Sequence, residues 1–283
     1  ERAAMTDASV SLLARPDLAD ARLQGLVRAR RHAPAAAMQT SCAALPIRAE
    51  PRDDAEQLDQ LIFGEVFDVL EEQAGRAWGR ARRDGTVGWV EVEGLSAPVL
   101  RPTHTVTALR AYALAEPQPK AAAVGLYSLN ALVTVEAERD GWLRGARCGW
   151  FPAGQLSPVG RAAAEPAEAA ERFLNAPWFH GGRESLGLDG AALVQQALYA
   201  AGLAGPRRPL EQAALGRPVE GEALRRGDLV LWREHAAVMI DERTLVHADP
   251  VTLVVRTQPL AEASAALRSA GHGEPTARRR LAA

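Results

Sequence analysis

The sequence predicts a multidomain protein in which two small all-β units precede an α+β domain. Three observations lead to this fold class. The chain has 283 residues, more than the roughly 250 that one hydrophobic core usually organises. Its first half repeats an order of short strand-like runs, and its last part combines helical runs with strand-like runs that follow them, which is the order of an α+β domain.

Changes in residue composition and in the pattern of apolar residues divide the chain into four segments. They are an N-terminal arm (1–39), a first all-β domain (40–100), a second all-β domain (101–160) and the α+β domain (161–283). In the arm, Leu23, Leu26 and Val27 alternate with arginines. A segment this short cannot bury them by itself, so we expect the arm to pack either on this chain or on another one.

The two all-β domains are predicted from short runs of strand-forming residues punctuated by glycines. The first set covers 61–63, 66–70, 77–81 and 87–90, and the second covers 124–127, 132–135, 141–145 and 148–151. Trp78 of the first set corresponds to Trp142 of the second, and the Gly-Trp pair at 88–89 returns at 149–150. This repeat resembles bacterial SH3-like barrels, and we expect two of them in tandem. One larger all-β domain is the alternative.

The last domain is predicted from two helical runs, 167–174 and 190–201, followed by four strand-like runs. The strand-like runs cover 228–232, 236–240, 244–247 and 251–256. Helices that precede and pack on an antiparallel sheet in this order are typical of a papain-like α+β domain.

The composition excludes several functional classes. With 24% charged residues and a formal net charge of −2, the chain shows no sign of a nucleic-acid partner. Cys42 and Cys148 are its only cysteines and lack metal-ligand spacing, so we expect no disulfide scaffold, metal or cofactor. No run of about 18 apolar residues predicts a membrane span. Residues 1–26 are too charged for a secretory leader, so we expect a cytoplasmic protein with Met5 as natural start, a removed leader being the alternative.

A cysteine peptidase requires a thiolate, a histidine that exchanges protons with it, and a group that orients this histidine. A helix N-terminus suits the thiolate because the helix dipole lowers its pKa. The segment 185–195, Ser-Leu-Gly-Leu-Asp-Gly-Ala-Ala-Leu-Val-Gln, has a glycine-containing loop that leads into an apolar helix. It resembles the Ser-x-Gly-Ile-Asp-Cys-Ser-Gly-Leu-Val-Gln stretch of NlpC-type bacterial cell-wall cysteine peptidases, which are papain-like. Asp189 and Gln195 match, but Gly190 stands where the family has its catalytic cysteine.

Two histidines extend the resemblance. The family's Arg-x-Gly-Asp-Leu-x-Phe strand is similar to residues 225–231, and His235 then stands where the catalytic histidine begins the next strand. His247 lies in a Val-His-Ala context similar to the strand whose histidine orients the catalytic one. The resemblance implies that both are triad positions, and without a nucleophile we interpret them as vestigial.

The resemblance also implies a substrate site, which differs here from the family pattern. The family's Tyr-x-Trp-Gly-Gly reads Trp-Phe-His-Gly-Gly at 178–182. Its Pro-Arg-Asp-Ser-Asp-x-Gln, whose serine and second aspartate bind the peptide's free amino end, reads Pro-Arg-Arg-Pro-Leu-Glu-Gln at 206–212, without the countercharge that an ammonium needs. The residues expected to line the remaining ligand site are Trp178, His180, Asp189 and Arg208.

These features predict a catalytically inactive homologue, or pseudoenzyme, of a γ-D-glutamyl-diaminopimelate cell-wall endopeptidase. It would bind another protein, either an active paralogue or a second copy of itself, or a muropeptide-like ligand. An active hydrolase with an unconventional nucleophile is the alternative. His180 is a third histidine that the fold could bring near His235 and His247, but the spacing matches no metal motif, so no metal site is expected.

Overall fold

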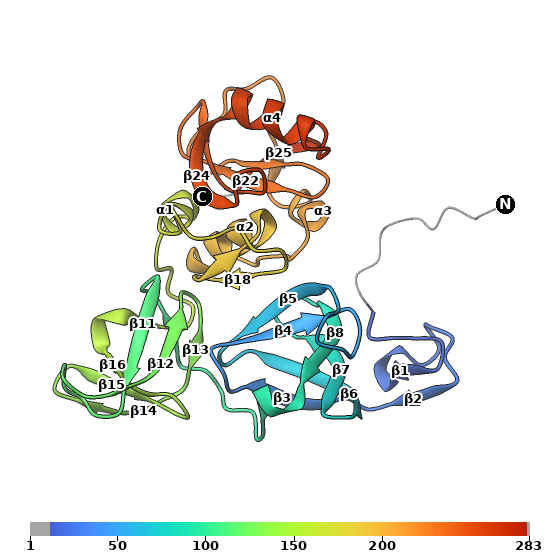
Figure 1. Cartoon of the computed structure of the whole chain (residues 1–283), viewed down its shortest axis with the longest axis vertical. Helices are drawn as coiled ribbons and strands as arrows, with labels where there is room; N and C mark the ends of the chain where they lie inside the picture. Colours follow the sequence, from blue (N-terminus) through green and yellow to red (C-terminus); the bar gives the residue numbers. More distant parts are fainter. Residues whose placement is uncertain (1–11, 282–283) are drawn as a thin grey trace.

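The computed structural model describes residues 12–281. In Figure 1 the two all-β regions lie side by side, and the C-terminal α+β domain lies across them. The described part of the predicted arm is attached to the first all-β region, on the side away from the second. Its residues before 12 lie outside the described part of the chain. No helix within 12–281 is long and apolar enough to cross a lipid bilayer.

The arm packs on the first all-β region of its own chain. Its strands β1 (Leu18–Asp20) and β2 (Arg31–Ala33) pair in parallel. Leu13 and Leu18 are buried against Trp78 and Trp89, which burial of apolar surface favours. Leu26, at the turn between the two strands, keeps 79% of its surface exposed. Of the two arrangements expected for the arm, the structure has the one in which it packs on this chain.

The first all-β region is one seven-stranded antiparallel sheet in the order β5-β4-β8-β7-β6-β3-β9. Its strands are β3 (Ala36–Thr40), β4 (Ala44–Arg48), β5 (Gln57–Ile62), β6 (Val66–Gln73), β7 (Arg76–Ala81), β8 (Val87–Glu91) and β9 (Leu95–Ser96). Two glycines allow the strands of this sheet to approach one another closely. A Cβ at Gly79 would lie 2.3 Å from the carbonyl oxygen of Asp68, and one at Gly88 would lie 2.7 Å from that of Arg48. Both contacts are too short for any side chain.

The second all-β region has a five-stranded sheet, β12-β11-β16-β15-β14, and a three-stranded sheet, β13-β10-β17. Its strands are β10 (His104–Val106), β11 (Arg110–Leu114), β12 (Ala123–Ser128), β13 (Leu132–Val133), β14 (Val135–Arg139), β15 (Trp142–Gly145), β16 (Gly149–Pro152) and β17 (Leu156–Pro158). Its core forms a cluster distinct from the main core of the first region, and Phe63 of the first region packs into it. The sequence repeat does not extend to the pairing, because Trp78 lies opposite Trp89 whereas Trp142 lies opposite Pro152.

The C-terminal domain has a six-stranded antiparallel sheet in the order β20-β25-β21-β22-β23-β24. Its strands are β18 (Arg183–Glu184), β19 (Gly187–Leu188), β20 (Arg217–Pro218), β21 (Leu229–Leu231), β22 (Ala236–Met239), β23 (Thr244–Asp249), β24 (Val254–Pro259) and β25 (Ala277–Arg280). Its helices are α1 (Pro166–Glu171), α2 (Gly190–Ala200), α3 (Pro209–Gln212) and α4 (Leu260–Ser269).

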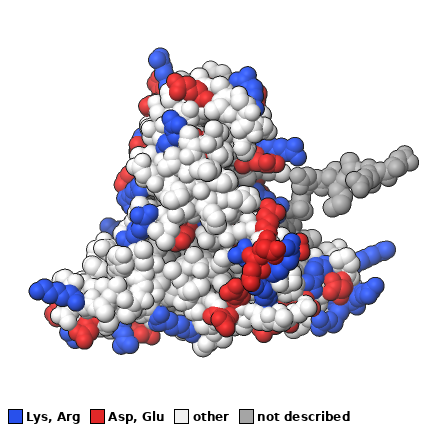
Figure 2. All heavy atoms as spheres, viewed as in Figure 1, with Lys and Arg blue, Asp and Glu red and all other residues white. Residues whose placement is uncertain are grey.

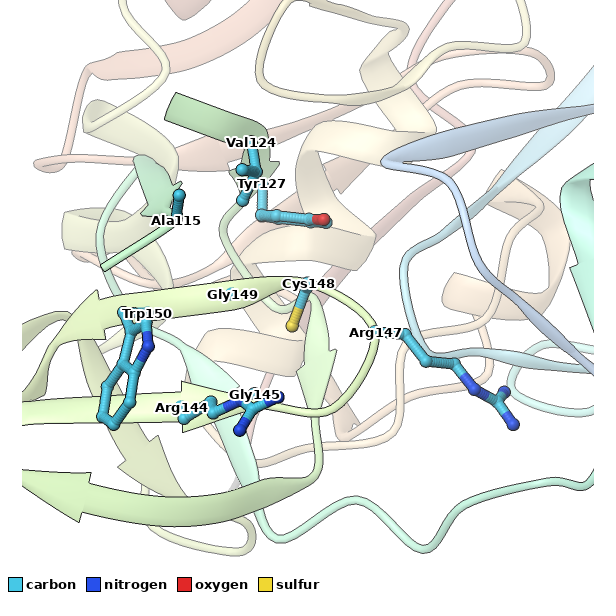
Figure 3. Close-up of a pocket in the computed structure, with 9 residues that line it drawn as sticks. All are labelled: Ala115, Val124, Tyr127, Arg144, Gly145, Arg147, Cys148, Gly149 and Trp150. Carbon is cyan, nitrogen blue, oxygen red and sulfur yellow. The ribbon is translucent and has the colours of Figure 1, made fainter. Parts of the chain in front are cut away.

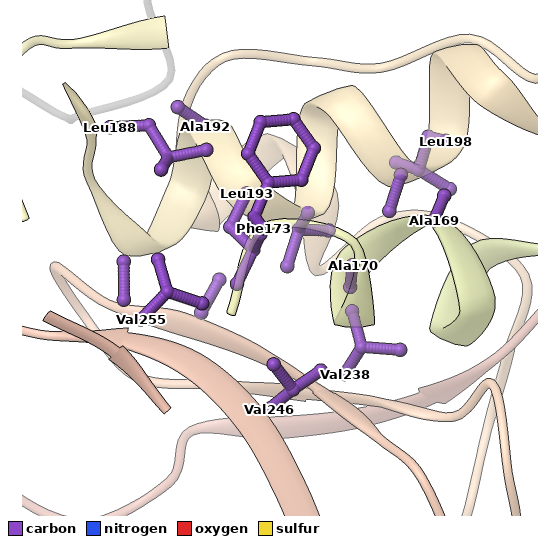
Figure 4. Close-up of a cluster of buried hydrophobic side chains, with 14 of the residues drawn as sticks. Ala169, Ala170, Phe173, Leu188, Ala192, Leu193, Leu198, Val238, Val246 and Val255 are labelled. Carbon is purple, nitrogen blue, oxygen red and sulfur yellow. The ribbon is translucent and has the colours of Figure 1, made fainter. Parts of the chain in front are cut away.

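Two hydrophobic clusters hold the helices on the sheet of this domain. Figure 4 shows the first cluster, in which Phe173, Leu193 and Val246 belong to the layer between α1, α2 and the sheet. In the second cluster, Leu267 of α4 packs with Trp232. The residues of each cluster are buried, so burial of apolar surface in the first cluster fixes α2 against β22 and β23, and in the second it holds α4 on the sheet.

Several predicted boundaries in this domain were wrong. The first helix ends at Glu171 rather than 174, and the last predicted strand begins at Val254 rather than 251. The reason for the second shift is a turn, in which the carboxylate of Asp249 accepts hydrogen bonds from the backbone N–H of Val251 and the hydroxyl of Thr252. Helix α4 and strand β25 were not predicted.

Candidate functional site

The start of α2 is the centre of the candidate site. Asp189 is its N-cap, and Oδ1 of the carboxylate accepts a hydrogen bond from the backbone N–H of Ala192 at 2.9 Å. Gly190 is therefore the first helical residue, at the end where free N–H groups and the helix dipole favour negative charge. Leu193 and Val194 are fully buried and anchor this end of the helix.

The two predicted histidines meet beside the helix start. His235 directly precedes β22, and His247 lies on the adjacent strand β23. Nε2 of His235 lies 3.0 Å from Nδ1 of His247, and Nε2 of His247 lies 3.2 Å from Oε1 of Gln258 on β24. A chain of hydrogen-bonding side chains thus runs from the helix start across the sheet.

His235 occupies the space that a side chain at position 190 would need. A Cβ added to Gly190 would lie 2.5 Å from Nδ1 and 2.6 Å from Cε1 of His235, and 3.0 Å from the carbonyl oxygen of Ala236. Such distances are well inside van der Waals contact. Because His235 is also 98% buried, its ring closes the position from solvent.

Burial keeps both histidines neutral. It lowers the pKa of His235 well below its usual value, and the neighbouring His247 and His272 lower it further. Burial also lowers the pKa of His247, although the charge of Asp249 opposes this shift. At neutral pH each ring has one N–H and one lone pair, so the contact between them is one neutral hydrogen bond.

No nucleophile among residues 12–281 bonds to this pair. Among the described residues, the side chain of His235 hydrogen-bonds only to His247. Ser185, the nearest hydroxyl in sequence, is buried, lies 2.8 Å from the hydroxyl of Ser128 and accepts from Arg110. Cys148 is buried in the core of the second all-β region. The arrangement can exchange protons, but it presents no described side-chain atom that could attack a carbonyl.

The four predicted ligand residues lie on the two segments that flank α2. Trp178 is half-buried and packs against the core below α2. His180 is exposed and lies 3.1 Å from Glu56 of the first all-β region. Asp189 caps α2, and Arg208 is exposed at the N-cap of α3. The ring centroids of Trp178 and His180 lie 6.3 Å apart, and Trp178 forms a β-bridge with Leu188, the residue before Asp189. Three of the four residues therefore lie together in the segment before α2, and Arg208 lies on the segment after it.

The idea that His180 could join the other two histidines was wrong. Instead, His272 lies near them, with its ring centroid 6.2 Å from that of His235. Within the described chain, no group of three or more potential ligands is arranged to hold a metal ion. His180 is drawn away because its loop contacts the first all-β region, where Gln57 donates to the carbonyl of Gly181.

Asp189 is bound internally by Arg207. The guanidinium of Arg207 donates to both carboxylate oxygens of Asp189, at 3.0 and 2.6 Å, and to Asp59 of the first all-β region at 2.6 Å. Oδ2 of Asp189 also accepts from the backbone N–H of Gly181. A bidentate arginine pair of this kind is strong, and it leaves the carboxylate little capacity for a ligand.

Arg183 forms a second link to the first all-β region. It is completely buried, donates from Nε to the carbonyl of Gln60 at 2.7 Å, and forms an ion pair with Glu65. Asp84 and Asp59 lie 3.3 and 3.5 Å from the guanidinium. One buried cation thus faces three carboxylates of the other domain.

The carboxylates of this cluster differ in pKa. Burial raises the pKa of Asp59 to about 7, partly offset by Arg183 and Arg207 and reinforced by the neighbouring Asp84. Burial acts on Asp84 in the same direction, but Arg183 and the N–H of Thr86 outweigh it and hold the pKa of Asp84 below its usual range. Like charges at close range separate the two titrations in this way.

Sequence reasoning missed four residues that shape the site: Arg183, Arg207, Gln258 and His272. Arg207 was within the motif at 206–212, where only its neighbours drew attention. Arg183 follows the Gly-Gly pair directly. An arginine placed between this turn and Asp189, which caps α2, was a usable signal of a residue close to the site. Gln258 and His272 carried none, because strand pairing and packing alone bring them to the histidines.

Comparisons with known proteins agree with this geometry. Residues 175–271 match the family model of the NlpC/P60 family, and residues 47–95 match the bacterial dipeptidyl-peptidase SH3 domain. The search of curated proteins gave no match. Among solved structures, an NlpC/P60 family protein from Bacillus cereus is 16% identical with a TM-score of 0.74, over 87% of this chain and 99% of that one. At this identity the likeness shows a shared fold.

Two further structures are less similar. NlpC1 from Trichomonas vaginalis is 17% identical with a TM-score of 0.43, over 87% of this chain and 92% of its own. The peptidoglycan hydrolase RipB from Mycobacterium tuberculosis is 19% identical with a TM-score of 0.34, over 42% of this chain and 65% of its own. The predictions of an NlpC-type α+β domain and of an SH3-type region before it are confirmed by the family models. The second SH3-like barrel and the loss of the catalytic cysteine stay predictions.

Proposed function

We propose that this chain, which carries an NlpC/P60 domain behind a bacterial dipeptidyl-peptidase SH3 domain, is a catalytically inactive cell-wall peptidase homologue with a binding or regulatory role. NlpC/P60 peptidases are normally cell-wall hydrolases. Here the ancestral reaction would be cleavage between D-glutamate and diaminopimelate in wall peptides.

One observation carries the proposal. At the start of α2, where this fold needs a thiolate, Gly190 has no side chain, and the ring of His235 fills the space beside it. Acyl transfer begins with attack on the carbonyl, and without that group neither the histidine pair nor the helix dipole has a nucleophile to activate.

The amine-binding part of the family site supports the same conclusion. Pro209 and Leu210 stand at the serine and second aspartate of the family's clamp, and both are in α3. Asp189 is ion-paired with Arg207. A peptide's free ammonium group would therefore meet no unpaired carboxylate from these positions.

The chain would act by binding a partner through its surface rather than by binding a substrate at this closed site. His235 is 98% buried, so a muropeptide could reach the histidines only if the packing opened. The partner that fits this arrangement is another protein, either an active relative or a second copy of the chain. The domain frame supports such a role, because the interface through Arg183 and Arg207 holds the first all-β region and the C-terminal domain together.

The activity test uses a γ-D-glutamyl-diaminopimelate peptide and chromatographic detection of the product. The wild type and His235→Ala should both show no turnover, with an active NlpC/P60 peptidase as positive control on the same peptide. Turnover by the wild type that disappears in His235→Ala would overturn the proposal in favour of an unconventional nucleophile.

Restoring the thiol tests the rest of the site. Gly190→Cys should give little or no hydrolysis, because the new Cβ meets His235 and the amine clamp is still missing. If this single change restores turnover, the clamp argument is wrong, and only the missing cysteine separates this chain from an active enzyme.

The partner proposal has its own test. Light scattering coupled to gel filtration should find a dimer of the chain, or a complex when an active relative from the same cell is added in equal amount. A monomer under both conditions would contradict the partner proposal without affecting the activity argument.

A further inference from the structure

The N-terminal arm ends in a turn that the proposed function does not use. Residues 24–31, which we call the arm tip, lead from the short helix after β1 into β2, at one end of the molecule in Figure 1. The backbone N–H groups of Leu26 and Val27 both donate to the carbonyl of Leu23, at 2.9 and 3.1 Å. A Cβ added to Gly25 would have no neighbouring atom within 4 Å. The arm tip is therefore a hydrogen-bonded turn that faces open space.

Leu26 is the apolar part of the arm tip. Its exposed fraction of 79% is the largest of any large hydrophobic side chain among residues 12–281. The turn itself forces this exposure, because Gly25 has a φ of +83° and the residue after it is turned away from the body of the chain. Val27, the next residue, is half-buried and anchors the turn. A single exposed leucine is common on protein surfaces, so Leu26 has to be considered together with its neighbours.

The neighbours of Leu26 carry positive charge that the arm does not neutralise. Residues 12–33 contain five arginines and two aspartates. Both aspartates are paired inside the arm, Asp17 with Arg15 at 3.2 Å and Asp20 with Arg22 at 2.5 Å. The remaining arginines are exposed, and no ion pair or side-chain hydrogen bond joins them to another residue of the described chain; they are Arg28, Arg30 and Arg31.

This set of free guanidinium groups creates a local field that the overall charge of the chain conceals. Arg147 illustrates the contrast, because its side chain, which is shown in Figure 3, donates to the hydroxyl of Ser96 and the carbonyl of Pro98. The formal net charge of the whole chain is −2. Figure 2 nevertheless shows basic side chains projecting at the end where the arm lies. A partner that the arm tip attracts must therefore be anionic.

We propose that the arm tip binds the surface of an anionic lipid bilayer. The three arginines would contact the headgroups, and Leu26 would enter the boundary between the headgroups and the acyl chains. A projecting turn can reach such a flat surface while the rest of the chain keeps its structure. Nucleic acid fits the arm tip less well, because residues 24–31 contain no aromatic side chain on which a base could stack, and Leu26 would gain nothing from phosphates.

Sedimentation of the full chain with lipid vesicles tests this inference. Vesicles of equal parts phosphatidylglycerol and phosphatidylcholine should bind the chain at least about tenfold more strongly than vesicles of phosphatidylcholine alone, and high salt should weaken the binding. Each arginine near an anionic surface contributes about fivefold in affinity, which is the equivalent of about 1 kcal/mol. Changing all three arginines of the arm tip to glutamine should therefore weaken binding about a hundredfold.

The matched control changes net charge by the same amount elsewhere on the surface. It combines three exposed arginines outside the arm, in the variant Arg161→Gln, Arg233→Gln and Arg278→Gln. This variant should sediment with anionic vesicles as the wild type does, because the arm tip is intact. An equal loss in the control and in the arm-tip variant would show that only the overall charge matters, and this would overturn the inference.

Leu26→Ser separates a lipid surface from other anionic partners. It should weaken binding to anionic vesicles about three- to tenfold, because an apolar side chain no longer enters the bilayer. The unfolding midpoint should stay that of the wild type, since Leu26 is exposed. Unchanged binding of Leu26→Ser would overturn the proposal in favour of an acidic protein or a nucleic acid that the arginines alone attract. Absence of binding to the anionic vesicles would also overturn it. The hydrolysis assay is independent of these results, because no residue of the arm tip belongs to the site at the start of α2.

Discussion

Removal of the charge of Arg183 is the sharpest test of how the domains are held together. Arg183→Met keeps much of the apolar stem but withdraws the one cation among residues 12–281 that contacts all three of Asp59, Glu65 and Asp84. Breaking a buried ion pair by removing one partner typically costs about 3 to 5 kcal/mol, because the other charge stays buried without compensation.

The remaining contacts set the expected value within this range. Glu65 keeps Arg83 at 2.8 Å, and Asp59 keeps Arg207 at 2.6 Å. Asp84 keeps the N–H of Thr86 and the side-chain amide of Gln195. Because each carboxylate keeps at least one partner, we expect the lower end, a loss of about 3 kcal/mol in the free energy of unfolding.

Urea unfolding followed by tryptophan fluorescence and circular dichroism measures this loss. Arg217→Met is the matched control, since it removes an arginine from an exposed pair with Glu222 and should leave the unfolding midpoint unchanged. Adding Glu65→Gln and Asp84→Asn to Arg183→Met should recover part of the loss, because the cost lies in unpaired charge. A loss below about 1 kcal/mol, or no recovery, would refute the reasoning.

Three further predictions concern the other buried groups. The pKa of Asp59 is raised to about 7, so its ionisation destabilises the fold as pH rises from about 4 to about 7. The unfolding free energy of Asp59→Asn should therefore rise relative to that of the wild type as pH increases from 5 to 8. If urea unfolding gives the same difference at every pH, the raised pKa of Asp59 is contradicted. Burial lowers the pKa of His235, whose contribution is complete above about 6.5 and lost as pH falls below it. His235→Gln should therefore flatten the decline in unfolding free energy between pH 7 and 5, and an unaltered slope would argue against a buried neutral ring. Gly190→Ala should destabilise the protein by about 1 to 3 kcal/mol, because the new Cβ contacts His235, although alanine ordinarily favours a helix. Higher stability of the variant in thermal unfolding would show that the His235 ring moves aside freely.

Much of the C-terminal domain was predictable because its signals are local. Asp189 caps α2 through a hydrogen bond three residues along the chain, and the apolar residues after Gly190 give the helix its buried face. The strands with His247 and with Leu229–Leu231 are short apolar runs bounded by turns. The turn after Asp249 was missed because its side-chain hydrogen bonds interrupt a run that looks continuous in sequence.

The sequence by itself therefore determined the order of domains, the start of α2 at a residue without a side chain, and the placement of one histidine before a strand and another on the neighbouring strand. The tertiary structure alone decided that His235 fills the place beside Gly190, that His272 rather than His180 lies near it, and that Asp189 is bound by an arginine. The physical reason is the separation along the chain of the residues that interact. Capping and periodicity act over a few residues, whereas the ion pairs of Arg183 with Glu65 and of Arg207 with Asp59 join residues 118 and 148 positions apart. Such contacts form only when separate domains exclude water from a shared interface, and no local pattern records them.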